Sequence, residues 1–458
     1  MIFFNKKLTV SIIFLLLIAL VSSTGAQEDR RLLFGDRNNR SFISVAFPEV
    51  PDKTLQELLD KMLSHNNSLK MMIATINRVR SEYAITRSAM SPKLDFFVSA
   101  GHSKGRDENS INNNDYLLSV PVSYEIDISK RLSHLTESAY LEMEAAVYER
   151  KALSMTLVAE LMERYYTGLF LLEQLKSIDE VITYTEKLGE LVNHQYKSGL
   201  ASKIDVISVE QAKKTLIANR TIFTETLPRI EHALSILAGE QPRNGWLKGA
   251  FSVPYWLEKE PAKPLDDYVQ QRPDIQNLRL RFVSSIYKAS AARSASKPAL
   301  YLTGNADSGA NEINKFMGDN KFGWGIFAKM QVPIFDGKRN QSEYDAKLYA
   351  SDELDKEYHE LLLTARVEAV NAMSSGIKQE EIVKIINTRN NLMAEEFEII
   401  KQRHDAGMGD LLSVIREKQN LVLARMEFNR HQLQFISFRI QLVRALGNGW
   451  WPPYLTKE

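Results

Sequence analysis

Apolar residues recur at every third or fourth position over long stretches of this chain, which is the spacing of one face of an α-helix. Three such stretches lie in the first half. The first begins at Thr54, which can cap it, and ends before Pro92. The second covers about residues 130–196, and the third returns from Lys203 to Leu237. The second helix would be about 100 Å long at 1.5 Å per residue, so we expect helices that pack side by side as in coiled coils.

Between the first two helices the period changes to two. Residues 93–103 and 116–127 alternate apolar with polar or small side chains, so we expect two β-strands joined by a polar loop. In the second of these strands the apolar set is Leu118, Val120, Val122, Tyr124 and Ile126. One face of each strand is therefore apolar, and the other is mostly polar or small.

A short stretch that contains a glycine interrupts the helical pattern in each half of the chain. Gly199 lies in the first of these stretches and Gly407 in the second. Glycine adopts the left-handed backbone that ends a helix without steric cost. Ser202 and Asp410 follow, and each has a side-chain oxygen that can cap the outgoing helix. We therefore expect two helical hairpins with these stretches as their tips.

The second half of the chain repeats the order of the first at a nearly fixed offset. The two tip glycines lie 208 positions apart, and Lys130 and Lys338 keep the same offset at the starts of the long helices. Pro92 and Pro298, which precede the strands, lie 206 positions apart. Unrelated helices would not keep such a register, so we interpret the chain as an internal duplication.

The N-terminus has the features of a secretory signal. Lys6 and Lys7 precede an apolar run that is short for a membrane anchor, the alternative, and small residues lead to a cleavage site after Ala26. The predicted parts are a signal peptide (1–26), an N-terminal extension (27–53), a first repeat (54–240; strands about 93–103 and 116–127, tip about 197–203), a linker (241–264), a second repeat (265–449; helices about 265–296 and 336–404, strands about 299–307 and 322–335, tip about 405–411) and a C-terminal tail (450–458).

Composition removes several classes of function. The chain is 44% hydrophobic and 25% charged, as folded proteins are, and its net charge of +1 gives no electrostatic basis for binding nucleic acid. It has no cysteine, which excludes disulfides, thiol catalysis and thiolate metal sites. His359 and Glu360 lack the second histidine of a zinc protease motif, and no glycine-rich phosphate loop occurs. We expect no enzyme, no cofactor and no metal site.

After the signal, no apolar stretch is long enough for a membrane helix, so a membrane role would fall to the strands. Their length and two-faced pattern suit a barrel with lipid outside and water inside, although a small soluble sheet on a helical bundle fits the alternation equally well. The signal and the long helices favour the barrel. Because four strands cannot close a barrel and open edges are not tolerated in lipid, several chains would pool their strands.

Several short motifs occur in a fixed order along the chain: Asn66–Leu69 and Arg272–Ile275, Pro92 and Pro298, Val332–Arg339, the tip glycines, and Ala445–Gly447. Because they occur in this order in both repeats, the chain resembles TolC-type outer-membrane efflux proteins over nearly the whole mature chain. The resemblance implies a mainly α protein with a small β part. Two repeats of long helical hairpins would form an α-helical tunnel, and four strands per chain would contribute to the twelve-stranded transmembrane β-barrel of a homotrimer. It also implies the outer membrane of a Gram-negative cell, with outer-membrane lipid around the barrel and the tunnel in the periplasm.

The resemblance further implies that a periplasmic adaptor (membrane fusion) protein and an inner-membrane pump dock at the tips. The candidate docking residues are Gly199, Leu200, Gly407 and Met408, and the candidate gate residues are Asp205, Asp410, Ser413 and Arg416. Asp205 matches an acidic position of the family's gate, but its counterpart in the second repeat is Ser413, and Arg416 stands where a further acid would lie. Asp410 either replaces the missing acids or only caps its helix. We hypothesise that Asp205 pairs with Arg416 or Lys418.

The leading hypothesis is a passive channel of a tripartite efflux or type I secretion system, for which drugs, metals and proteins are all possible cargo. The alternative is a secreted or surface coiled-coil structural protein without a pore. The strict alternation from Phe322 to Ile334 favours the channel, because a structural rod has no use for it.

Overall fold

The computed structural model describes residues 52–103, 113–254, 264–310 and 321–447. The predicted signal peptide, most of the N-terminal extension and the C-terminal tail lie outside these residues. The described residues form two compact units. The strand unit comprises Ala74–Val147 and Asn277–His359, and the hairpin unit comprises 52–73, Tyr148–Gln276 and 360–447.

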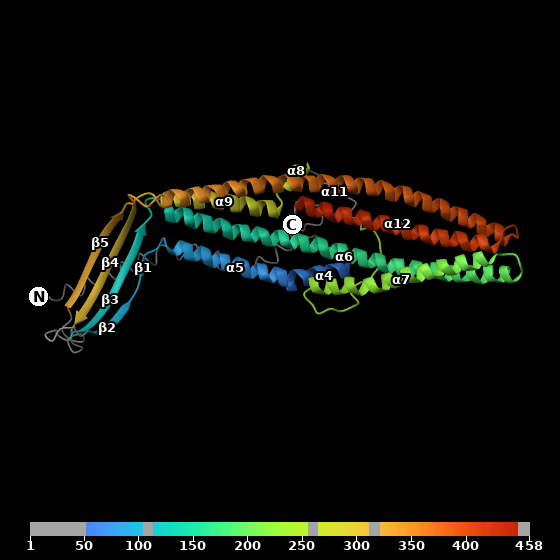
Figure 1. The fold of residues 1–458 in the computed structure, drawn as a ribbon, viewed down its shortest axis with the longest axis horizontal. Coiled ribbons are helices and arrows are strands. Elements are labelled where there is room, and N and C mark those ends of the chain that lie inside the picture. Colours follow the sequence, from blue (N-terminus) through green and yellow to red (C-terminus); the bar gives the residue numbers. More distant parts are fainter. Residues whose placement is uncertain (1–51, 104–112, 255–263, 311–320, 448–458) are drawn as a thin grey trace. The chain divides into compact units, whose positions relative to one another are not determined.

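The sheet belongs to the strand unit, and all its pairings are antiparallel (Figure 1). Its strands are β1 (Lys93–Leu94), β2 (Phe97–Ser103), β3 (Asn113–Ile126), β4 (Ala299–Ala310) and β5 (Lys321–Gln331). Across the sheet the order is β1 and β2 together, then β3, β4 and β5. The predicted end of the last strand at 335 is wrong, because Pro333 has no N–H to offer a ladder and the strand ends before it.

The first predicted strand is divided into β1 and β2 by a proline on its neighbour. The N–H of Asp95 donates to the carbonyl of Pro121 at 3.1 Å, but Pro121 has no N–H with which to return the bond. The register is the same on both sides of this gap. β1 and β2 therefore act as one strand, and the prediction of four strands holds with this interruption.

The described helices follow the predicted duplication. They are α4 (Lys53–His65), α5 (Asn67–Ser88), α6 (Arg131–Lys197), α7 (Lys203–Leu237), α8 (Leu265–Val269), α9 (Pro273–Ser294), α11 (Arg339–Asp405) and α12 (Leu411–Leu446). The long helices α6 and α11 each have 67 residues, and each follows a lysine in the left-handed region, with φ of 61° at Lys130 and 69° at Lys338. None of the described helices combines the length and the apolar character needed to cross a membrane.

Two helices predicted to be continuous are broken. The helix expected at 54–91 is α4 and α5, and the one at 265–296 is α8 and α9. The cap expected at Thr54 is also wrong, since the carboxylate of Asp52 accepts from the N–H of Thr54 at 2.9 Å and therefore caps α4. Neither break changes the apolar spacing, so periodicity alone could not find it.

The two breaks occupy equivalent places in the two repeats. At the first, Asn66 caps α5 by accepting from the N–H groups of Ser68 and Leu69, and its Nδ2 donates to the carbonyl of Leu237 at 2.9 Å. At the second, Nη1 of Arg272 donates to the carbonyl of Ala445 at 3.2 Å. Each side chain therefore ties the start of a helix to the end of the return helix of its own repeat.

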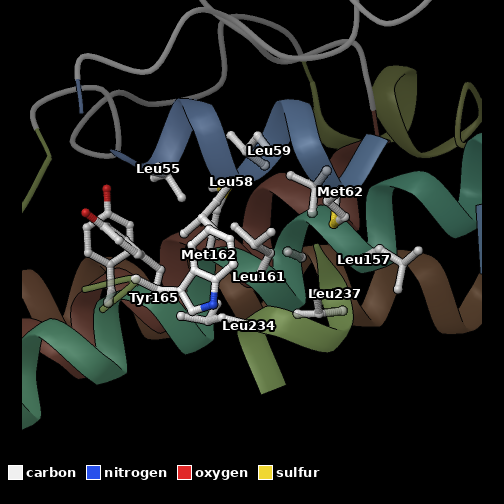
Figure 2. Packing of buried hydrophobic residues seen from close by; sticks show 14 of the residues in the cluster. Leu55, Leu58, Leu59, Met62, Leu157, Leu161, Met162, Tyr165, Leu234 and Leu237 are labelled. Carbon is white, nitrogen blue, oxygen red and sulfur yellow. The ribbon is translucent and has the colours of Figure 1, made fainter. Parts of the chain in front are cut away.

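The largest apolar core of the hairpin unit lies where α4 packs on α6 and α7, and Figure 2 shows the α4 side chains directed at those helices. The labelled residues are Leu55, Leu58, Leu59, Met62, Leu157, Leu161, Met162, Tyr165, Leu234 and Leu237. Trp246, in the segment predicted to be a linker, is buried in the same core, and its Nε1 donates to Oγ of Ser235 at 2.7 Å. Ile436 and Ile440 of α12 belong to the same core, which therefore joins the return helix of the second repeat to α4, α6 and α7.

Candidate functional site

The register of the sheet brings most apolar positions of the strands onto one face, because directly paired residues share a face. The rows of this face are Ile126–Leu300–Met330, Tyr124–Leu302–Ala328, Leu94–Val122–Gly304–Ile326, Val120–Ala306–Trp324, Val98–Leu118–Ser308–Phe322 and Ala100–Tyr116–Ala310. On β5 this surface is open to solvent in the single chain, where Trp324 and Ile326 are each 65% exposed. We call this surface the apolar face.

The height of the apolar face matches a membrane. From Leu300 to Ala310 is ten residues, or about 34 Å along the strand at about 3.4 Å per residue. A strand tilt of about 40° reduces this to about 26 Å, and the apolar band of outer-membrane barrels is about 25 Å tall. Tyr116 and Tyr124 lie near its two borders, where barrels have aromatic girdles.

The opposite face, which we call the water face, is mostly polar. Arg131 forms an ion pair with Glu125 at 2.7 Å, and Lys93 forms one with Asp95 at 2.9 Å. Oγ of Ser119 donates to Asp307 at 2.5 Å across β3 and β4. Charged and hydrogen-bonded side chains of this kind suit a surface in contact with water rather than lipid.

Both edges of the sheet are open among the described residues, since β1 and β2 on one side and β5 on the other have no further strand. With three antiparallel steps between them, the two edge strands run in opposite directions. One copy of the chain could therefore add β5 to the β1–β2 edge of another in the antiparallel sense.

The tip glycines end the incoming helices as predicted. Gly199 has φ of 75° and Gly407 has φ of 74°. At the first tip the N–H of Leu200 donates to the carbonyl of Gln195 at 2.8 Å, and the N–H of Met408 makes the corresponding bond at the second. In such a turn the residue after the glycine often packs back on its helix. Here Leu200 is 80% and Met408 is 69% exposed, which leaves an apolar side chain free at each tip.

The outgoing helices are capped with the roles of serine and aspartate exchanged. In the first repeat Ser202 is the N-cap, and Asp205 accepts in return from its N–H and its hydroxyl, each at 2.8 Å. In the second repeat Asp410 is the N-cap and accepts from the N–H of Ser413 at 2.7 Å. Each tip therefore keeps one carboxylate at the start of its outgoing helix.

Hydrogen bonding lowers the pKa of both carboxylates. The backbone N–H of Ser202, followed by its hydroxyl, lowers the pKa of Asp205, and Ser413 does the same for Asp410. Asp410 thus has the capping role that the sequence allowed as one alternative.

The candidate gate residues do not form an ion pair within the described part of a single chain. Asp205 accepts from Ser202, and Arg416 is near enough only to add a minor electrostatic lowering of its pKa. Nζ of Lys418 instead lies 5.0 Å from the centre of the Phe397 ring. The pairing of Asp205 with Arg416 or Lys418 remains a prediction for assembled chains.

Sequence reasoning missed a groove beside the tips, because its walls come from α6, α11 and α12. The groove has a volume of about 860 Å³. Its lining combines apolar side chains (Leu191, Phe397, Leu411, Val414 and Ile415) with charged or titratable ones (Lys187, Glu190, His194, Glu398, Lys401, His404, Asp405 and Lys418). A groove that offers both apolar and charged side chains is a surface on which a partner helix can lie.

Long helical hairpins in two repeats, joined to a sheet with one membrane-high apolar face, define a class of envelope channel proteins. The outer membrane efflux protein family model matches residues 58–234 and 265–448. The chain therefore belongs to the outer membrane efflux protein family. The family confirms the predicted outer-membrane location and a transport role.

Known proteins that resemble the chain do so over most of their length. The toluene efflux pump outer membrane protein TtgI of Pseudomonas putida is 23% identical over 430 residues, 91% of each chain. OprJ of Pseudomonas aeruginosa, an outer membrane protein, is 23% identical over 88% of this chain and 85% of its own. The crystal structure of the outer membrane protein VceC of Vibrio cholerae superposes with a TM-score of 0.77 at 18% identity, over 88% of this chain and 99% of VceC. The predicted fold class, a helical tunnel with a β-barrel, is confirmed.

Proposed function

We propose that three copies of this chain form the outer-membrane channel of a tripartite efflux system. In this proposal the channel is a passive conduit, and a periplasmic adaptor docked at the hairpin tips hands over substrates from an inner-membrane pump. The observation that carries the proposal is the sheet, whose register collects most apolar residues of its strands on one membrane-high face.

The open edges support assembly from several copies. Unpaired N–H and C=O groups at a sheet edge are not tolerated in lipid, so a closed ring of strands is required. The opposite directions of the β1–β2 edge and of β5 allow each copy to pair with the next in the same antiparallel way. Three copies of four strands give the twelve-stranded barrel implied by the family resemblance.

The long helix α11 offers a second surface for neighbouring copies. Leu363, Val370 and Ile377 follow one another at seven-residue steps, and so do Ile385, Leu392 and Ile399; all six are exposed. Apolar residues at this spacing form the seam along which one helix packs on another. Covering this stripe with helices of adjacent copies would produce the helical tunnel.

The tips provide the surface for the adaptor. Leu200 and Met408 are exposed at the tips, and the groove formed by α6, α11 and α12 has apolar lining side chains that suit the apolar stripe of a helical partner. Changing Leu200 and Met408 to Asp should abolish co-purification with the adaptor while the assembled channel remains intact. Ile222→Asp, an exposed position on α7, is the matched control and should leave adaptor binding unchanged.

Efflux rather than protein secretion is favoured by the relatives. TtgI is named as part of a toluene efflux pump, and others are named as parts of solvent or antibiotic efflux pumps. We propose small organic compounds as the cargo.

The central test is the mass and conductance of the purified protein. Native mass measurement in detergent should give three chains per particle, and the particle should conduct ions in a planar bilayer. A stable monomer with a folded sheet, or a trimer without conductance, would contradict the proposal.

We place the gate of this channel at the capped tips. In the closed ring Asp205 would pair with Arg416 or Lys418 of a neighbouring hairpin. Asp205→Ala should then raise single-channel conductance with the trimer intact. Equal conductance of wild type, Asp205→Ala and Arg416→Ala would refute this gate and leave the channel itself untouched.

A further inference from the structure

Two phenylalanine side chains interrupt the polar pattern of the water face. Phe97 on β2 is 55% exposed, and Phe327 on β5 is 62% exposed. Their register places them on the water face, because Phe97 pairs with Ser119 and Phe327 with Thr303. Exposed aromatic rings on a surface that faces water gain nothing from lipid, so they are candidates for contact with a solute.

The ring of Phe327 is held down on the sheet rather than extended into solvent. A Cβ atom at Gly325, two residues earlier on the same face, would lie 2.8 Å from Cε2 and 2.9 Å from Cζ of Phe327. A side chain at position 325 would meet the ring and displace it. The ring therefore lies over the backbone of Gly325.

Hydrogen bonds on the neighbouring strands fix the surroundings of this ring. Oγ of Ser119 donates to Asp307 at 2.5 Å, and Nδ2 of Asn305 donates to the other carboxylate oxygen of Asp307. Oδ1 of Asn305 lies 3.3 Å from the point where a Cβ atom of Gly325 would stand, so Asn305 borders the same part of the sheet that the ring covers.

We propose that Phe327, set over Gly325, is a stacking site for planar aromatic solutes that pass along the water face. The inference rests on the proposed channel, since only there does this face line the conduit. A ring that already lies against the sheet loses less conformational freedom when a solute stacks on it than one extended into solvent. Stacking on an aromatic face tolerates many planar ring systems, which suits a conduit for varied compounds.

The test is single-channel recording of the reconstituted trimer with ethidium as the planar probe. Tetrabutylammonium, a cation without rings, serves as the matched probe for charge and bulk. Ethidium should interrupt the current of the wild type, and Phe327→Leu should shorten these interruptions by about 3- to 10-fold. Interruptions by tetrabutylammonium should not change. Phe322→Leu, on the same strand but on the apolar face, should behave as the wild type.

Further variants separate stacking from general damage to the barrel. Phe327→Tyr should keep the ethidium effect, whereas Gly325→Ala should displace the ring and weaken the effect as Phe327→Leu does. If Phe327→Leu fails to assemble, the test of the stacking site is whether ethidium interruptions are shorter in Gly325→Ala than in Phe327→Tyr. Equal ethidium interruptions in all these channels would overturn the stacking site. A wild type without conductance would instead refute the channel.

Discussion

Replacing Trp324 by arginine tests which face of the sheet meets lipid. Trp324 pairs with Ala306, which lies six residues along β4 from Leu300, the inner border of the apolar face. At about 3.4 Å per residue and a tilt of about 40°, this is about 16 Å up a band about 26 Å high. The side chain thus lies within about 3 Å of the middle of the membrane.

The expected cost of Trp324→Arg follows from this depth. An arginine on the lipid face near the midplane of a barrel costs about 2–4 kcal/mol, which is about a 30- to 700-fold change in the unfolding equilibrium of each chain. Three copies in one ring would multiply the free energy to about 6–12 kcal/mol. Trp324 is 65% exposed in the chain, so loss of its contacts with neighbouring strands adds little.

The matched control is Thr303→Arg, an exposed position on the water face of the adjacent strand. Both variants place the same charge on the sheet, but only one places it in lipid. Urea unfolding in phospholipid vesicles, followed by circular dichroism, should show a large loss of stability for Trp324→Arg and a change within about 0.5 kcal/mol for Thr303→Arg. Equal destabilisation by the two variants would refute the assignment of the faces.

Three further predictions concern the cap of α5, the tips and the N-terminus. Asn66→Ala removes the cap of α5 and leaves the carbonyl of Leu237 unbonded, so the free energy of unfolding should fall by about 2–4 kcal/mol in urea titration. Asn66→Asp keeps the cap but loses the bond to Leu237, so its free energy of unfolding should lie between those of the wild type and Asn66→Ala. Because hydrogen bonds depress the pKa values of Asp205 and Asp410, their caps stabilise the tips at neutral pH, and this stabilisation is lost as the pH falls below the ordinary value of 3.8 through the depressed pKa. Amide hydrogen exchange at the tips, corrected for intrinsic rates, should therefore be faster below pH 3.8 than at neutral pH. Equal protection of these amides at the two pH values would contradict this. N-terminal sequencing of the exported protein should begin at Gln27, and an uncleaved chain in the membrane would speak against the signal.

The tips and the strands were predictable because their signals are local. Gly199 and Gly407 need a backbone that other residues rarely adopt, and a neighbouring serine or aspartate caps the next helix. Because successive side chains of a strand point to opposite faces, the alternation in the sequence also assigns each residue to a face of the sheet. Duplication doubled each of these signals.

The breaks at Asn66 and Arg272 were not predictable in the same way. Each depends on a carbonyl more than 170 residues away in the sequence, at Leu237 or Ala445. Helical spacing continues through both breaks, so only the tertiary contact identifies them. The gap between β1 and β2 is similar, since its cause is Pro121 on the neighbouring strand.

The candidate site was predictable only in part. Serine and aspartate exchange places between the two tips: the pair is Ser202 and Asp205 in the first repeat and Asp410 and Ser413 in the second. This exchange can be recognised in the sequence once the caps are known. Without the hydrogen bonds, however, Ser413 was interpreted only as a missing acid. The groove requires three helices to be placed side by side, which no spacing along one helix reveals.

The two open edges of the sheet have a consequence for genetics. A chain whose β5 edge is blocked still presents an intact β1–β2 edge, so it can join a growing ring without being able to complete it. In a cell that makes mutant and normal chains in equal amounts, only about one trimeric ring in eight would contain normal chains alone. Mutations at the sheet edges should therefore be dominant over the normal allele, whereas mutations that prevent a chain from folding at all should be recessive.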